Sequence, residues 1–265
     1  MTSVLPSLFV SHGSPTLAIE DGEARRFLTG LGETIGRPAA ILVVSAHYDE
    51  PVASITNGAA PSTIYDFGDF ARELKSLTYP APGDPALAER VAGLLAGAGI
   101  EVYQDQERGF DHGTWVPLIL MYPKADVPVV QLSINSRKGP DYHLALGRAL
   151  APLRGEGVLI VGSGAVTHNL RELFGDALDH DRRAPDWVVD FADWVSERVE
   201  QGLVDDLLAY RALSPSGERN HPTEEHLLPL FAALGAGEAR GGRRIHASQT
   251  YGLLAMDVYS FGAAA

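Results

Sequence analysis

The sequence contains no cysteine. This absence excludes disulfide bridges, thiolate zinc sites, iron–sulfur clusters and cysteine nucleophiles. A metal ion bound by this protein must therefore be held by histidine, aspartate or glutamate side chains. The chain has nine histidines and 34 acidic residues, so a site of that kind is feasible.

Long apolar runs and an excess of positive charge are also missing. No apolar run approaches the ~20 residues that span a membrane, so we expect no membrane partner. Residues 1–13 (MTSVLPSLFVSHG) lack the basic region of a signal peptide, which favours a cytoplasmic protein. The net charge of −13 argues against a nucleic-acid partner, which would require clustered lysine and arginine. Assembly into a homo-oligomer is left open.

What the chain does have is an alternation of strand and helix patterns. Apolar runs predict strands over Leu5–Val10, Ala39–Val44, Ile100–Tyr103, Val127–Ile134, Gly157–Val161, His246–Ser248 and Leu253–Tyr259. Amphipathic patterns predict helices over Asp21–Leu31, Phe70–Leu77, Asp84–Ala98, Thr114–Met121, Asp141–Leu153, Asp186–Gln201 and part of Thr223–Leu234, where Pro229 requires a kink or a later start. Residues 213–220 and the Pro61–Gly68 segment are predicted loops.

The alternation predicts an α/β fold in a single domain over residues 1–261. We expect a largely parallel or mixed central sheet flanked by helices, with the active site at the carboxyl ends of the strands. Residues 262–265 are expected to form a disordered tail.

Histidines follow three of the predicted strands. His12 and His47 come just after the first two, and His168 follows Gly162-Ser163-Gly164 at the end of another. Parallel strands bring their carboxyl ends to one edge of a sheet, so two of these imidazoles could bind one metal. The alternative is that each is a hydrogen-bonded turn residue.

A third ligand would have to be another histidine or a carboxylate. The segment 221–226 (HPTEEH) supplies His221, Glu224, Glu225 and His226 as candidates, and its alternative is a capping segment with solvated glutamates.

Other motifs carry weaker signals. Gly162-Ser163-Gly164 lacks the lysine of a P-loop and the third glycine of a dinucleotide fingerprint, and no Gly-x-Ser-x-Gly nucleophile elbow surrounds Ser14. Asp111 and His112 are either a helix cap with its first-turn residue or polar groups lining an aromatic pocket. The Tyr65-Asp66-Phe67 loop is a further pocket wall or a packed surface loop. His143, His180 and His246 belong to no motif and are interpreted as helix, loop and strand residues.

Eight segments together resemble the class III extradiol ring-cleaving dioxygenases, in their DOPA 4,5-dioxygenase-like branch. These segments occur at residues 11–16 (SHGSPT), 43–48 (VVSAHY), 63–70 (TIYDFGDF), 79–88 (YPAPGDPALA), 109–118 (GFDHGTWVPL), 127–135 (VPVVQLSIN), 162–171 (GSGAVTHNLR) and 221–236 (HPTEEHLLPLFAALGA). Their order is that of the family and they span nearly the whole chain.

The resemblance implies a function and a set of site residues. His12, His47 and His226 would bind one divalent metal, with Fe(II) for activity, although Zn(II) also suits three imidazoles. His168 would be the acid–base catalyst and His112 a substrate-facing residue. The implied reaction inserts O2 into a small, DOPA-like catechol and opens its ring. The alternatives are a zinc hydrolase that uses the same three histidines, and a non-catalytic binding protein on the same scaffold.

Overall fold

The structure is a computed structural model that describes residues 4–68, 72–172 and 179–262. Its centre is an eight-stranded sheet in the order β4-β3-β5-β2-β6-β1-β10-β7. The strands are β1 (Ser7–Ser11), β2 (Ala40–Asp49), β3 (Ala53–Thr56), β4 (Val102–Asp105), β5 (Val129–Ile134), β6 (Val158–Gly164), β7 (Gly242–His246) and β10 (Val258–Phe261). A separate short hairpin consists of β8 (Gln249–Thr250) and β9 (Leu254–Ala255).

The sheet is mixed. The four inner strands β5, β2, β6 and β1 are parallel, whereas β10 and β7 add antiparallel strands at one side. At the other side β3 runs antiparallel to β5 and parallel to β4. The predicted α/β fold with a mixed central sheet is therefore confirmed.

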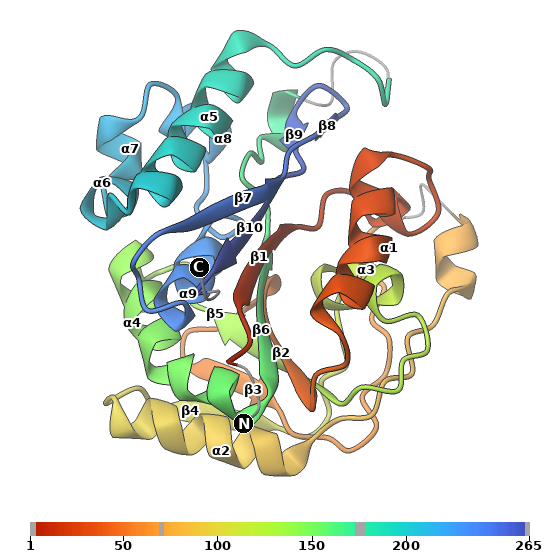
Figure 1. The fold of residues 1–265 in the computed structure, drawn as a ribbon. Coiled ribbons are helices and arrows are strands. Elements are labelled where there is room, and N and C mark those ends of the chain that lie inside the picture. Colours follow the sequence, from red (N-terminus) through yellow and green to blue (C-terminus); the bar gives the residue numbers. More distant parts are fainter. Residues whose placement is uncertain (1–3, 69–71, 173–178, 263–265) are drawn as a thin grey trace.

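Helices cover both faces of the sheet (Figure 1). One face packs against α1 (Glu23–Ile35) and α3 (His112–Met121). The other packs against α2 (Pro85–Gly97), α4 (Pro140–Leu150), α5 (Asp186–Gln201) and α9 (Leu228–Ala236). Shorter helical turns are α6 (Val204–Leu208), α7 (Tyr210–Leu213), α8 (Gly217–Asn220), η1 (Pro15–Ala18), η2 (Arg72–Ser76), η3 (Ala151–Glu156) and η4 (Leu170–Glu172). None of the helices in the described ranges is long and apolar enough to cross a membrane.

The two helical layers explain why the inner strands are apolar on both sides. In β2, Leu42 and Val44 point into the cluster beneath α4 and α9, while Ile41 and Val43 point toward α1 and α3. All four side chains are fully buried. An unbroken apolar run is the pattern expected of a strand covered on both faces.

Several sequence predictions need correction. The sequence patterns did not predict β3, and residues 213–220 contain helical turns instead of a continuous loop. The helix predicted over Phe70–Leu77 is a 3₁₀ turn at Arg72–Ser76, and residues 69–71 lie outside the described ranges. The helix that contains Pro229 begins at Leu228, so the proline occupies the first turn, where its missing N–H costs no hydrogen bond. Of the predicted tail only Gly262 is described, and its carbonyl accepts a hydrogen bond from Arg154.

Candidate metal centre

Three adjacent strands place two histidines at one edge of the sheet. His12 follows β1 directly, and its backbone N–H donates to the Gly164 carbonyl at the end of β6, 2.9 Å away. His47 lies near the end of β2, on the other side of β6. In β2 the register with β5 jumps from Ser45 to Asp49, so His47 sits in a bulge. A β-bulge changes the direction in which a side chain points, and this bulge contains His47 at the edge of the sheet.

His226 reaches the same edge because two glycines let a distant segment approach β6. The Ala165 N–H donates to the His226 carbonyl over 2.8 Å. A Cβ at Gly164 would stand 2.1 Å from that carbonyl oxygen, and a Cβ at Gly162 would stand 2.2 Å from the carbonyl of Pro229. Glycine is required where two backbones come this close. Gly162 and Gly164 therefore serve packing.

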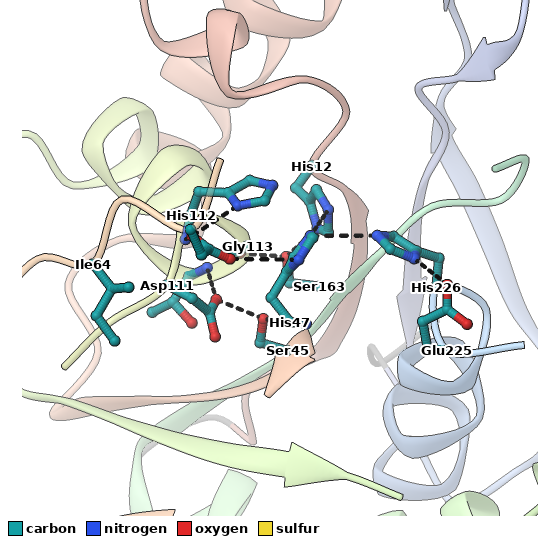
Figure 2. A network of polar contacts seen from close by, with 12 residues as sticks. His12, Ser45, His47, Ile64, Asp111, His112, Gly113, Ser163, Glu225 and His226 are labelled. Atoms are coloured by element: carbon teal, nitrogen blue, oxygen red, sulfur yellow. Dashed lines mark hydrogen bonds and ion pairs between the residues drawn. The ribbon is translucent and has the colours of Figure 1, made fainter. Parts of the chain in front are cut away.

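The three imidazoles converge through their Nε2 atoms (Figure 2). The Nε2 of His47 lies 3.0 Å from that of His12 and 3.3 Å from that of His226. Metal–imidazole bonds of ~2.0–2.1 Å place two ligand nitrogens roughly 3.0–3.4 Å apart. The spacing and the chemistry of the donors therefore fit one divalent metal ion.

Hydrogen bonds fix the tautomers of two of these rings. The Ser163 hydroxyl donates to the Gly113 carbonyl, so its oxygen must accept from Nδ1 of His12, 3.0 Å away. The Nδ1 of His226 lies 3.1 Å from a Glu225 carboxylate oxygen, which can only accept. Both rings therefore carry their proton on Nδ1 and keep the Nε2 lone pair free for a metal.

Burial also keeps the cluster neutral. Burial and the neighbouring imidazoles lower the pKa values of His12 and His226 well below the ordinary 6.5. Burial, followed by the charge of His112, lowers the pKa of His47 to about 3. Protons therefore do not compete with a metal for these nitrogens near neutral pH.

His112 lies beside the cluster at the start of α3. Its ring contacts the ring of His47, with centroids 3.8 Å apart and the two planes tilted by 47°. One oxygen of Asp66 accepts from both the backbone N–H and Nδ1 of His112, each over 2.9 Å. Burial raises the pKa of Asp66, but the hydrogen bonds and charge of His112 outweigh it and lower that pKa to about 2. In the neutral form of the ring with its proton on Nδ1, the Nε2 of His112 is a hydrogen-bond acceptor.

A buried network supports the bulge and the start of α3 together. Asp111 is fully buried and caps α3 by accepting from the Thr114 N–H. It also accepts from the Ser45 hydroxyl over 2.7 Å and from the Arg108 guanidinium over 3.2 Å. Burial raises the pKa of Asp111. Arg108 donates in addition to the His47 carbonyl over 3.1 Å, so one cation joins the bulge to the helix cap.

His168 stands at the edge of the cluster. Its ring stacks on that of His226, with centroids 3.4 Å apart and planes 10° from parallel. Its backbone N–H donates to the Asn220 carbonyl. Burial lowers the pKa of His168 to about 4, against the opposing charge of Glu225. The ring is therefore neutral near pH 7.

The other candidates from the sequence have separate roles. His221 donates through Nε2 to the Val166 carbonyl, and Glu224 accepts from the Tyr210 hydroxyl. Glu225 contacts Nδ1 of His226 and is not one of the converging Nε2 donors. His143 is bonded to Asn135 and Gly139, His180 to Asp181 and His246 to Ser248, all outside the described three-histidine group.

Three supporting residues carried no recognisable signal in the sequence. In the sequence Ser163 lies in a glycine-rich turn, Arg108 belongs to no motif, and Asp66 lies in a loop that is either a pocket wall or a packed surface loop. Each acts through a contact across the fold, with His12, His47 or His112. The order of polar residues along the chain contains no trace of such contacts.

Comparison with known proteins gives matches over nearly the whole chain. The family model of the catalytic LigB subunit of aromatic ring-opening dioxygenase matches residues 6–261. A 4,5-DOPA dioxygenase extradiol of Beta vulgaris is 41% identical over 264 residues, covering 98% of this chain and 97% of its own. One from Escherichia coli K12 is 45% identical over 237 residues, covering 88% and 85%. The crystal structure of an uncharacterized protein from Escherichia coli K12 superposes with a TM-score of 0.81 at 39% identity, covering 97% of this chain and all of that one.

Proposed function

Because this chain belongs to the LigB family of aromatic ring-opening dioxygenases, we propose that the three-histidine group is the metal centre of an extradiol dioxygenase that opens a small catechol with O2. The observation that carries the proposal is the convergence of three neutral Nε2 atoms at the carboxyl edge of the parallel strands. The relatives are named 4,5-DOPA dioxygenases, so we take a DOPA-like catechol as the substrate class.

His12, His47 and His226 are proposed as the metal ligands, with Fe(II) as the ion that supports activity. A bound Fe(II) would supply the electron transfer that lets O2 react with the catechol ring. Three imidazoles also suit Zn(II), so zinc is expected to compete for the centre. The ligand set contributes no charge of its own, and the nearest carboxylates, Asp66 and Glu225, contact imidazole Nδ1 atoms.

Two further histidines are proposed to act on the substrate. His112 presents Nε2 as an acceptor, because Asp66 holds its Nδ1 proton, and this nitrogen would orient a catechol hydroxyl. His168 is neutral, so one of its ring nitrogens can take up the proton that a catechol hydroxyl releases and return it later. Its stacking on His226 would hold it next to the substrate.

The proposal is tested by loading the protein with Fe(II) under anaerobic conditions and then adding a panel of catechols with oxygen. We expect oxygen uptake together with a yellow ring-opened semialdehyde in the visible spectrum. Apo protein and zinc-loaded protein are the controls and should consume no oxygen. Hydrolysis of added esters without oxygen uptake would instead favour the zinc hydrolase and would refute the dioxygenase.

A further inference from the structure

The Asp66 carboxylate touches two of the histidines that the proposed function uses. One oxygen accepts from the backbone N–H and the Nδ1 of His112, each over 2.9 Å. The other oxygen lies 3.5 Å from Nδ1 of His47. The two imidazole rings are in contact, with centroids 3.8 Å apart and planes tilted by 47°. A single side chain therefore lies against the Nδ1 sides of a proposed metal ligand and of a proposed substrate-facing residue.

The loop that carries Asp66 is fixed by backbone contacts to the segment before α3. The Phe110 N–H donates to the Ser62 carbonyl and the Ile64 N–H to the Phe110 carbonyl, both over 2.8 Å. The indole N–H of Trp115 donates to the Ile64 carbonyl over 3.0 Å. These bonds hold the loop beside α3. The position of Asp66 is therefore built into the fold.

The close fit between these two segments has a sequence requirement. A Cβ at Gly109 would stand 2.2 Å from the Ser62 carbonyl oxygen, so the two chains can lie together only with glycine there. Downstream of this contact the phenolic oxygen of Tyr65 donates to the Leu77 carbonyl over 2.6 Å. The residues that precede Asp66 are thus held by contacts to two other segments of the chain.

We propose that Asp66 is a positioning residue that fixes the rings of His47 and His112 together, and so couples the metal ion to the orientation of the substrate. This inference rests on the proposed function. When Nε2 of His47 binds a metal, its Nδ1 must carry the proton and face the Asp66 oxygen. His112 donates its own Nδ1 proton to the same carboxylate. A carboxylate has no proton of its own, so Asp66 can face both Nδ1–H groups at once.

Variants at Asp66 test its contacts with Nδ1 of His47 and Nδ1 of His112. The variant D66N keeps the shape of the side chain but offers only one acceptor oxygen, and its NH2 group must face one of the two Nδ1–H groups. The variant D66A removes both contacts. The matched control is D84N, because Asp84 also accepts a backbone N–H, from Leu87 over 2.9 Å, but it caps α2.

The experiment uses the full-length, zinc-loaded protein, so that no readout depends on turnover. Zinc affinity is measured by competition with a chromophoric chelator, and the tautomers of His47 and His112 by ¹⁵N NMR of the imidazole rings. We expect D66N and D66A to bind zinc 10- to 100-fold more weakly than D84N and wild type. In wild type the Nδ1–H form of His112 should dominate, and in D66A it should lose that dominance.

Each half of the inference can fail by itself. A zinc affinity in D66N and D66A equal to that of D84N would overturn the link to His47. An unchanged His112 tautomer in D66A would overturn the link to the substrate side. Circular dichroism shows whether each variant folds. If D66A does not fold, the zinc affinity of the isosteric variant D66N alone decides whether Asp66 supports His47. If wild-type protein loaded with Fe(II) consumes no oxygen with any catechol, the proposed function fails while these two readouts still stand.

Discussion

Replacing Gly164 with alanine should damage the proposed metal centre through the backbone. The new Cβ would stand 2.1 Å from the His226 carbonyl oxygen, whereas real Cβ atoms stay at least 3.0 Å from such an atom. The segment must therefore retreat by about 0.9 Å, the difference between the two distances. The hydrogen bond from Ala165 to the same carbonyl would stretch with it.

The expected loss of zinc affinity is large because a metal site tolerates only small changes in metal–ligand distance. Metal–ligand distances vary by only about 0.2 Å, so a shift of His226 by several times that amount should weaken zinc binding at least 10-fold. The overpacking itself should cost roughly 1–3 kcal/mol of unfolding free energy. Zinc affinity is measured by chelator competition and stability by urea unfolding.

Two glycines of the same chain provide matched controls. A Cβ at Gly147 would stand 2.0 Å from the Ala232 carbonyl, so G147A creates a clash of the same size against α9 at a position in α4. Gly30 lies in α1 with nothing within 4 Å, so G30A should stabilise by ~1 kcal/mol. G147A should lose stability but keep zinc affinity. If G164A bound zinc as tightly as G147A, the glycine would not be what positions His226.

Three further predictions concern single histidines. H168F should lower turnover at least 100-fold while metal content, measured by atomic absorption, stays at the wild-type level, because phenylalanine preserves the stacking on His226; unchanged turnover would contradict its role. H226A should lose metal on dialysis, and full occupancy would remove His226 from the ligand set. Burial lowers the pKa of His143 to about 4, so its stabilising effect is complete above pH 6.5 and is lost as the pH falls toward 4. In metal-free protein, the unfolding free energy measured with urea should fall by roughly 3 kcal/mol over that pH range because of this group, and in H143N this part of the fall should be absent. If wild type and H143N showed the same dependence of unfolding free energy on pH, His143 would not be the group responsible.

The sequence predicted the part of the centre that depends on strands. His12 and His47 follow apolar runs, and parallel pairing through β6 brings such ends together without further information. The bulge that aims His47 was not visible, because it arises where Ser45 and Asp49 pair with consecutive residues of β5.

The place of His226 beside His47 was predicted only from the family resemblance, because 179 positions separate the two residues in the sequence. Its approach depends on packing between α9 and β6, and the only local sign of that packing is the pair Gly162 and Gly164. The strand β3 was missed for a related reason. Residues 53–56 (ASIT) are too few to establish a period, and their pairing with β4 and β5 decides their conformation.

The positions of the three proposed ligands along the chain set the order in which the proposed centre can form. His12 and His47 come together once β1, β2 and β6 have paired, which needs only residues up to 164. His226 arrives when α9 closes over β6. A growing chain therefore brings two imidazoles together only after residue 164 has been made, and it gains the third nitrogen after residue 226. Tight metal binding would thus require the completed fold, so an unfinished chain would not be held in a partly folded state by a bound ion.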